Sequence, residues 1–247
     1  MFSFCDSLTS FSIPDFITTI GDGAFSRCSS LTSIIIPDSV TTIGEYAFSN
    51  CPSLSSITLP NSITTIGGYA FTSCTALTSI SIPDSVVSIG NGAFNWCTSL
   101  TSVTIPDSVT HLGDCAFYGC TALSSISIPN SVTYLGSGAF CKCESLTSIT
   151  IPDSVTAIGD TTFYGCTSLV SITIPNSVTS IEFNAFYNCS SLRSVTIPDS
   201  VTSIGFSTFS KCPNLTLTVP HNSYAAEYAK ANSIPYIYPD TYDWLNN

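Results

Sequence analysis

Cysteine recurs at a fixed interval of 23 residues through most of this 247-residue chain. The ladder that it forms consists of Cys5, Cys28, Cys51, Cys74, Cys97, Cys120, Cys143, Cys166, Cys189 and Cys212. Thiols can bind metals or pair as disulfides. Cysteines of neighbouring repeats should have Cα atoms about 4.8 Å apart, but their side chains point the same way, which keeps the Cβ atoms beyond the roughly 3.5 to 4.5 Å that a disulfide prefers. A single cysteine at the same place in every repeat is instead typical of a small buried hydrophobe. We therefore expect the ladder thiols to be free and buried.

Two other cysteines, Cys115 and Cys141, stand outside the ladder, and we expect them to be the reactive thiols of the folded chain. His111, Cys115 and Cys120 share one repeat and raise the question of a zinc site. Cys120 belongs to the ladder and should point inward, and no Cys-x-x-Cys pair accompanies it. We therefore predict no metal site and no cofactor.

A short acidic or amide side chain follows the recurring proline of each repeat. We call a set of equivalent positions in successive repeats a column. This column consists of Asp15, Asp38, Asn61, Asp84, Asp107, Asn130, Asp153, Asn176 and Asp199. Stacked carboxylates could bind calcium, but asparagine fills three of the nine places, so negative charge is not the recurring property. An acceptor that bonds the backbone two residues further on explains both residue types, which predicts Asx-turns.

Large aromatic residues replace small or polar ones at a few variable positions of the repeat. They are Trp96, Tyr118, Tyr164, Tyr187, Tyr46, Tyr69 and Tyr134. Specificity in a repeat protein comes from positions at which the repeats differ, so these are the candidate binding residues. We expect the first four to form one stripe; the alternative is that each ring only folds over the edge of its own coil. Lys142, Arg193 and Lys211 look isolated in the sequence and receive no role.

The composition argues against several classes of function. The chain has two histidines, His111 and His221, and no glycine-rich phosphate loop, so no catalytic residue is predicted. Five Lys and Arg against 16 Asp and Glu give a net charge of -11, which leaves no basic patch for nucleic acid. No apolar run approaches the roughly 18 to 20 residues of a membrane span, and the first ten residues do not resemble a signal peptide. We expect a protein or glycoprotein partner, with no membrane insertion and no small-molecule substrate.

The elements that position these residues follow from one repeat unit, residues 28–50, which reads CSSLTSIIIPDSVTTIGEYAFSN. Alternation around Ile34 and Ile36 predicts a short strand, which Pro37 ends because proline has no N–H for a ladder. The Ala-Phe segment is long enough only for a helical or 3₁₀ turn that carries Phe48 inward. One coil buries too little apolar surface to offset the entropy of ordering it, so neighbouring coils must stack. The prediction is an α/β solenoid, a right-handed superhelix of about ten coils, with a parallel sheet on one face and helical or 3₁₀ turns on the other.

The character of the chain changes after the last unit. We expect a solenoid over residues 1–216, which begins in the middle of a repeat, and a capping segment over residues 217–247. Asn222 or Ser223 can cap a helix that ends near Asn232. Tyr236 lies in an alternating segment that is typical of an edge strand.

The recurring pattern LTSITIPDSVTSIGxxAFxxC resembles the BspA-like class of leucine-rich repeats, and the resemblance covers more than four fifths of the chain. That class is found in surface proteins of anaerobic bacteria and of mucosal protozoan parasites. The resemblance implies a leucine-rich-repeat fold, a role in adhesion or host interaction, and a cell-surface or secreted location. It brings no catalytic residues. Because no signal peptide or anchor is recognised, a cytoplasmic location and the role of an intracellular scaffold stay open, as does that of a spacer for another domain.

Overall fold

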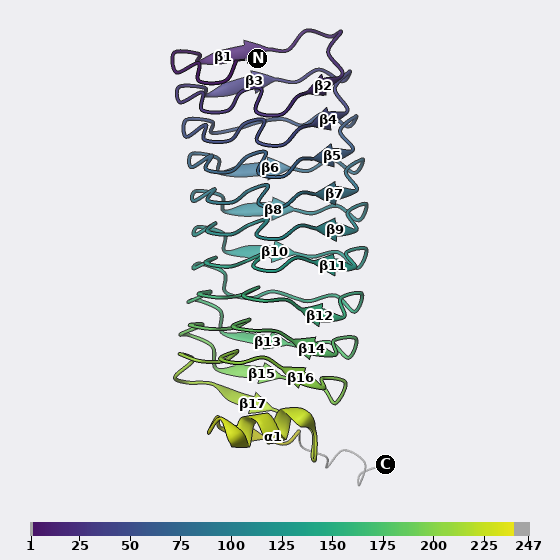
Figure 1. Ribbon diagram of the computed structural model, residues 1–247, viewed down its shortest axis with the longest axis vertical. Coiled ribbons are helices and arrows are strands. Elements are labelled where there is room, and N and C mark those ends of the chain that lie inside the picture. The colour runs from purple at the N-terminus through teal and green to yellow at the C-terminus, as the bar shows by residue number, and fades with distance from the viewer. Residues whose placement is uncertain (1, 240–247) are drawn as a thin grey trace.

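The chain winds into a stack of similar coils along one long axis (Figure 1). The computed structural model describes residues 2–239. We count the coils from the ladder cysteines, so that the first coil is residues 5–27 and the ninth is residues 189–211. Consecutive coils pair through parallel strands, and the predicted solenoid is thereby confirmed.

The first ladder of parallel strands is formed by the Ser-x-Ser/Thr segments. Its strands are β1 (Ser10–Ser12), β3 (Ser33–Ile35), β6 (Ser79–Ser81), β8 (Ser102–Thr104), β10 (Ser125–Ser127), β13 (Ser171–Thr173), β15 (Ser194–Thr196) and β17 (Thr216–Thr218). In β8 the side chain of Val103 is buried between exposed Ser102 and Thr104, and Val103 pairs with Ile126 of β10. The alternation predicted from the sequence is therefore observed.

A second ladder of two-residue strands lies on another side of each coil, and the sequence analysis did not predict it. Its strands are β2 (Thr19–Ile20), β4 (Thr42–Ile43), β5 (Thr65–Ile66), β7 (Ser88–Ile89), β9 (His111–Leu112), β11 (Tyr134–Leu135), β12 (Ala157–Ile158), β14 (Ser180–Ile181) and β16 (Ser203–Ile204). This ladder is continuous from β2 to β11 and starts again at β12. Most coils therefore have a strand in each of two ladders that bond them to their neighbours.

The helical or 3₁₀ turns expected in the Ala-Phe segments are not what forms: residues 2–223 have hydrogen-bonded turns and no helical segment. The reason is the direction of the backbone hydrogen bonds. The N–H groups of Tyr46 and Phe48 donate to the carbonyls of Gly68 and Ala70 in the next coil, at 2.9 and 2.8 Å. Tyr46 also has a left-handed φ of 56°, which a right-handed helix excludes. Bonds between coils have replaced the bonds that a helix would make within one coil.

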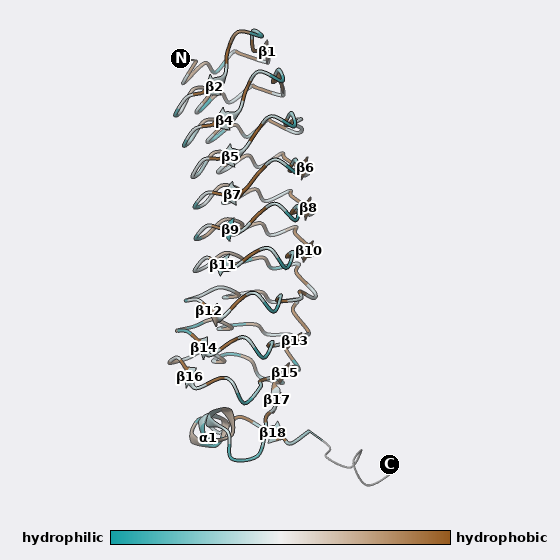
Figure 2. Ribbon diagram, turned by 90° about the vertical axis from the view of Figure 1, so that its right-hand side faces the viewer, coloured by the Kyte–Doolittle hydropathy of each residue, from teal (hydrophilic) through white to brown (hydrophobic). Residues whose placement is uncertain are grey.

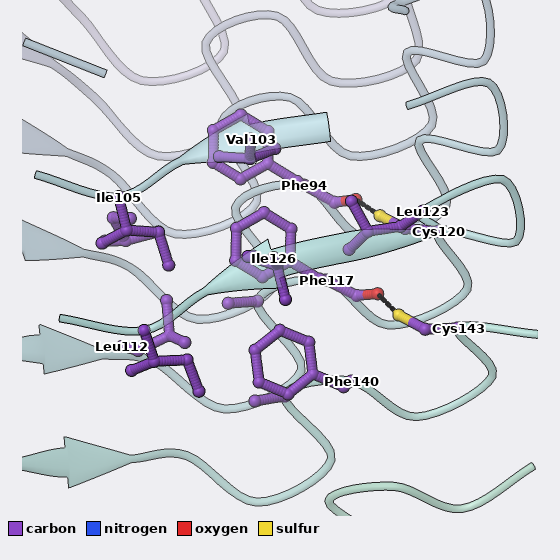
Figure 3. Close-up of a cluster of buried hydrophobic side chains, with 14 of the residues drawn as sticks. Phe94, Val103, Ile105, Leu112, Phe117, Cys120, Leu123, Ile126, Phe140 and Cys143 are labelled. Atoms are coloured by element: carbon purple, nitrogen blue, oxygen red, sulfur yellow. Dashed lines mark hydrogen bonds between the residues drawn. The ribbon is translucent and has the colours of Figure 1, made fainter. Parts of the chain in front are cut away.

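The core is a stack of phenylalanine rings, one for each coil, beside the cysteine ladder (Figure 3). Ring centroids of successive coils are 5.2 to 5.8 Å apart and the rings are nearly parallel. Cys120 is fully buried, and its thiol donates a hydrogen bond at 3.1 Å to the carbonyl of Phe94, which lies 26 residues earlier in the chain. Cys143 makes the same bond to Phe117 at 3.2 Å. Eight of the ten ladder thiols are therefore buried as predicted, whereas Cys5 and Cys212, at the two ends of the ladder, are half-buried. The buried thiols also act as donors that join different coils. In Figure 2 the hydrophobic segments recur in coil after coil.

The turn after each recurring proline differs from the prediction. In the second coil the N–H of Val40 donates to the carbonyl of Pro37 at 3.1 Å, and the hydroxyl of Ser39 donates to the carbonyl of Ile17 in the preceding coil at 2.6 Å. The Asp and Asn side chains of this column are exposed, and within residues 2–239 none of them makes a hydrogen bond. The predicted Asx-turns are wrong because the backbone and the serine already satisfy the turn.

The C-terminal segment forms the helix α1 (Tyr224–Ala231) and the strand β18 (Tyr236–Ile237), which lie at the end of the stack (Figure 1). Ser223 is the N-cap of α1 and its hydroxyl accepts a hydrogen bond from the N–H of Ala226 at 3.2 Å, so the predicted capping is confirmed. The strand β18 pairs with β17 as an edge strand. Residues 240–247 of the expected capping segment lie outside the described residues.

Candidate functional site

Six side chains form a continuous row along the surface of the solenoid, two of them exposed and four half-buried, and we call it the aromatic–lysine stripe. It takes one residue from each of the fourth to ninth coils: Trp96, Tyr118, Lys142, Tyr164, Tyr187 and Lys211. The order is aromatic, aromatic, lysine, and the same order then repeats. The four aromatic residues expected to form one stripe are therefore members of one row, and two lysines belong to it as well.

The first half of the stripe packs around the ammonium group of Lys142. The rings of Trp96 and Tyr118 meet edge to face, with centroids 5.4 Å apart. The Nζ atom of Lys142 lies 5.5 Å from the Trp96 ring centre and 5.6 Å from that of Tyr118. Both distances are within the range of a cation–π interaction. The Trp96 ring stays 40 % exposed, so this half of the stripe is an accessible surface.

A glycine in the next coil provides the room for the Trp96 ring. Gly119 has a φ of +70°, and a Cβ atom placed there would lie 2.8 Å from Cε3 of Trp96. Trp96 therefore leans over Gly119, toward Lys142 one coil further on. Lys142 in turn lies beside Gly165, where an added Cβ would be 3.7 Å from the lysine Cγ.

The second half of the stripe repeats the arrangement with two tyrosines. Tyr164 and Tyr187 stack with centroids 5.0 Å apart and planes inclined by 8°. The Nζ atom of Lys211 lies 5.1 Å from the Tyr187 ring centre. Hydrogen bonding to the phenol of Tyr187 raises the pKa of Lys211, and the phenol of Tyr118 does the same for Lys142. Both lysines are therefore cationic at neutral pH.

The local sequence explains why these side chains face outward. Phe117 and Tyr118 are adjacent, and the turn directs Phe117 into the core and leaves Tyr118 half-buried at the surface. Trp96 and Lys142 occupy a backbone position with a left-handed φ, at 58° and 59°. This conformation is repeated in neighbouring coils, so its side chains are aligned along the stack.

The charge of the stripe differs from that of the chain as a whole. The two sequence columns that supply it contain no Asp or Glu, although the chain has a net charge of -11. Three of the five basic residues, Arg27, Lys142 and Lys211, occupy the same column. Arg27 also lies over an aromatic ring, that of Phe4, at 5.0 Å. The sequence analysis assigned no role to the two lysines; an alignment of the units in steps of 23 residues would have placed them in the Trp96 column.

The other three candidate binding residues, Tyr46, Tyr69 and Tyr134, lie outside the two repeat positions that supply the stripe. Tyr46 and Tyr69 stack at 5.1 Å, and Tyr69 covers the left-handed Gly92. Burial raises the pKa of Tyr69. This pair fits the alternative interpretation, in which a ring folds over a coil edge.

Tyr134 belongs to the second strand ladder. Its ring stacks on His111 with centroids 4.3 Å apart, and its hydroxyl donates to a carboxylate oxygen of Asp114 at 3.0 Å. That hydrogen bond is the main reason that the pKa of Tyr134 is raised. His111 therefore packs on the outside of the solenoid, whereas Cys120 points inward, and the three residues considered for zinc do not converge.

The two cysteines outside the ladder have different environments from those expected. Cys141 is only 5 % exposed, and burial raises its pKa to about 12, so the prediction of a reactive thiol is wrong for this residue. Cys115 is half-buried, and burial raises its pKa as well. Cys141 was misjudged because the same repeat position holds half-buried tyrosines in other coils, and the sequence does not say which of these side chains fold inward.

An apolar hollow of about 330 Å³ opens at the N-terminal end of the stack. Phe2, Phe11, Ile13, Ile20 and Phe25 contribute to its wall. It has few polar groups, and such groups are what fixes a small ligand in a binding pocket. The stripe is therefore the stronger candidate for a functional site.

Comparison with solved structures finds other leucine-rich-repeat proteins. A leucine-rich cell surface protein from Faecalibacterium prausnitzii is 30 % identical, over 94 % of this chain and 84 % of that one, with a TM-score of 0.47. The pneumococcal vaccine antigen PcpA is 25 % identical over 85 % of this chain and 62 % of its own, with a TM-score of 0.61. A leucine-rich-repeat protein from Eubacterium ventriosum is 26 % identical over 88 % of this chain and 62 % of its own, with a TM-score of 0.60.

Three further observations help to classify the chain. Among the described residues, no helix has the length and hydrophobicity that a membrane span requires. No curated protein sequence matches the chain. The family model "BspA type Leucine rich repeat region" matches six copies, over residues 1–124 and 87–216. The chain therefore belongs to the BspA-type leucine-rich-repeat family.

Proposed function

We propose that this chain is a non-enzymatic binding module that attaches a cell surface to a protein or glycoprotein partner through the aromatic–lysine stripe. The observation that carries the proposal is the stripe itself: the exposed ring of Trp96, three half-buried tyrosine rings and two cations in a row on an otherwise acidic molecule. Aromatic residues supply much contact area at a low entropy cost, and they are enriched where binding energy is concentrated.

The length of the stripe is suited to a macromolecule. Its six members lie on consecutive coils, and a spacing of about 4.8 Å between paired strands gives a row about 24 Å long. A surface of this length can anchor a protein partner, whereas small ligands need a concave pocket. The description of the Faecalibacterium prausnitzii relative as a cell surface protein agrees with a surface location for this one.

The test compares binding by the wild-type chain with binding by a stripe variant, Trp96→Ser/Tyr118→Ser/Tyr164→Ser. Beads that carry each protein are incubated with biotinylated surface extract and, separately, with cytosolic lysate. We expect the stripe variant to have the circular dichroism spectrum of the wild type and to retain at least tenfold less surface protein. A tenfold loss of affinity corresponds to about 1.4 kcal/mol of binding free energy. The matched control is Phe183→Ser/Phe206→Ser, which removes two exposed rings, 46 % and 80 % exposed, outside the stripe.

The outcomes separate the proposal from its rivals. Equal retention by the stripe variant and the wild type would place binding elsewhere, with the Ser/Thr strand face as the next surface to test. Retention from the cytosolic lysate alone would indicate an intracellular scaffold. No retention from either fraction would favour a spacer that carries another domain.

A further inference from the structure

The two lysines of the stripe are three coils apart, and this spacing restricts the kind of partner that can meet both. Lys142 and Lys211 each end a group of two aromatic residues and one lysine. At about 4.8 Å for each coil, three coils separate the two ammonium groups by about 14 Å along the solenoid. A partner that engages both lysines must therefore present two anionic groups at about that distance.

Each ammonium group is held in place and still has donors to offer. A lysine ammonium has three N–H donors, and the cation–π contacts of Lys142 and Lys211 leave these donors able to bond an anion. The aromatic rings, 5.1 to 5.6 Å from the two Nζ atoms, restrict the side chains and lower the entropy lost when an anion binds. Since no Asp or Glu occurs in the two columns of the stripe, an acidic partner meets complementary charge there.

An extended peptide matches the spacing better than a helix does. Side chains on one face of a strand repeat every second residue, so residues i and i+4 are separated by about 13.6 Å. On a helix, residues on one face seven or eleven apart are separated by about 10.5 or 16.5 Å. In an extended segment, residue i+2 would lie over the stacked pair Tyr164 and Tyr187, whose rings offer an apolar contact.

We propose that the stripe binds an extended acidic segment of a partner protein, with carboxylates at positions i and i+4 on Lys142 and Lys211 and an apolar side chain at i+2 between them. This inference rests on the proposed function, because it names the partner chemistry of the same surface. It predicts a dependence on the spacing of the acids that net charge alone does not produce.

The test uses two labelled peptides of identical composition. In the first, Gly-Ser-Glu-Thr-Val-Thr-Glu-Ser-Gly, the acids are four apart; in the second, Gly-Ser-Glu-Thr-Val-Glu-Thr-Ser-Gly, they are three apart. A spacing of three turns one carboxylate to the opposite face of an extended chain. By fluorescence anisotropy at low salt, we expect the first peptide to bind at least about threefold more tightly, and the difference to shrink as salt is added.

Lysine variants show whether the peptide uses the stripe. Lys142→Met and Lys211→Met keep an aliphatic side chain and remove the charge. Each should lower the affinity for the first peptide by about threefold and abolish the preference for the first peptide over the second. Arg193→Met, which removes an exposed cation outside the stripe, is the control and should have no effect on either peptide.

The possible failures are distinguishable. Equal affinity for the two peptides, no binding up to about 1 mM, or binding unaffected by the lysine variants would each overturn the inference. Preferential binding of a sulfated glycan in the same assay, reduced by Lys142→Met, would overturn it in favour of a polysaccharide. In each of these cases the proposed function stands if the stripe variant still loses the surface partner, and it fails if that variant binds like the wild type.

Discussion

The molecule contains two stacks of aromatic rings that run side by side, one in the core and one on the surface. Phe117 and Tyr118 are adjacent in sequence and belong to the core stack and to the stripe, respectively. Neighbouring rings are 5.2 to 5.8 Å apart in the core and 5.0 to 5.4 Å apart in the stripe. The core stack has phenylalanine in every coil, whereas the stripe changes from coil to coil and includes lysine. The same repeat thus supports a uniform interior and a variable exterior.

The difference shows what each stack depends on. Within the stack each core ring, such as Phe117, lies between two others and beside a buried thiol, so a change in one coil affects its neighbours. The stripe rests on that core and adds little to it, since solvent covers one side of each of its residues. Substitutions in the core should therefore change stability, and substitutions in the stripe should change binding.

The largest expected effect is on the core at alkaline pH. Burial raises the pKa of Cys120 from its ordinary value of 9.0 to about 12, and it raises the pKa values of Cys97 and Cys143 well above 9.0. The unfolded chain then loses these protons first, so the free energy of unfolding should fall as the pH rises from 9 toward 12. Each buried thiol contributes a slope of about 1.4 kcal/mol per pH unit in that range, and together they should unfold the chain.

Guanidinium unfolding followed by circular dichroism between pH 8 and 11 measures this slope. Cys97→Ala/Cys120→Ala/Cys143→Ala should flatten it, whereas Trp96→Ser, which removes no titrating group, should leave it unchanged. If the triple cysteine variant keeps the wild-type slope, the interior thiols are not the cause.

The next effect compares the two neighbouring rings directly. Phe117→Ala opens a cavity in a fully buried stack and should lower the free energy of unfolding by about 3 to 5 kcal/mol. Tyr118→Ala removes a half-buried ring and should lower it by less than about 1.5 kcal/mol. Denaturant titration of both variants measures the two losses. Similar losses would mean that Tyr118 is a packing residue, and the separation between the two stacks would fail.

The smallest effect concerns the glycines beneath the stripe. Gly119 and Gly165 share a φ of +70°, so an alanine at either position should lower the free energy of unfolding by about 1 kcal/mol. Only at Gly119 would the new Cβ meet an aromatic ring, since it would lie 2.8 Å from Trp96 and, at Gly165, 3.7 Å from Lys142. Gly119→Ala should therefore also shift the emission of Trp96 and weaken partner binding.

Fluorescence in a Trp244→Phe background isolates the Trp96 signal, and Gly165→Ala serves as the matched control. Identical emission spectra for the two alanine variants would show that Trp96 does not depend on the space over Gly119.

Much of the scaffold could be predicted from the repeat. A period of 23 residues, strand alternation around Ile34 and Ile36, and the proline that follows were enough to predict stacked coils with parallel strands. These features depend on the residue types within one unit, and each unit repeats them. The Ser223 cap of α1 was predictable for the same reason, because capping is a local interaction.

The candidate site was only partly predictable. Alignment of the aromatic positions identified Trp96, Tyr118, Tyr164 and Tyr187, but not the two lysines. Lys142 contacts Trp96, which is two coils earlier, and this contact depends on Gly119 in the coil between them. A relation among three coils is not visible within any single repeat.

The sequence by itself determined the period of this protein, the residues of its core and the positions at which its coils differ, because these depend on side-chain type and spacing along the chain. Only the tertiary structure decided the turns, the thiol hydrogen bonds and the contacts of the two lysines. In each case the deciding contact joins different coils: the N–H of Tyr46 bonds to Gly68, and the thiol of Cys120 bonds to Phe94. The physical reason is that a single coil has too little buried surface to be stable, so the conformation of each coil is chosen by its neighbours.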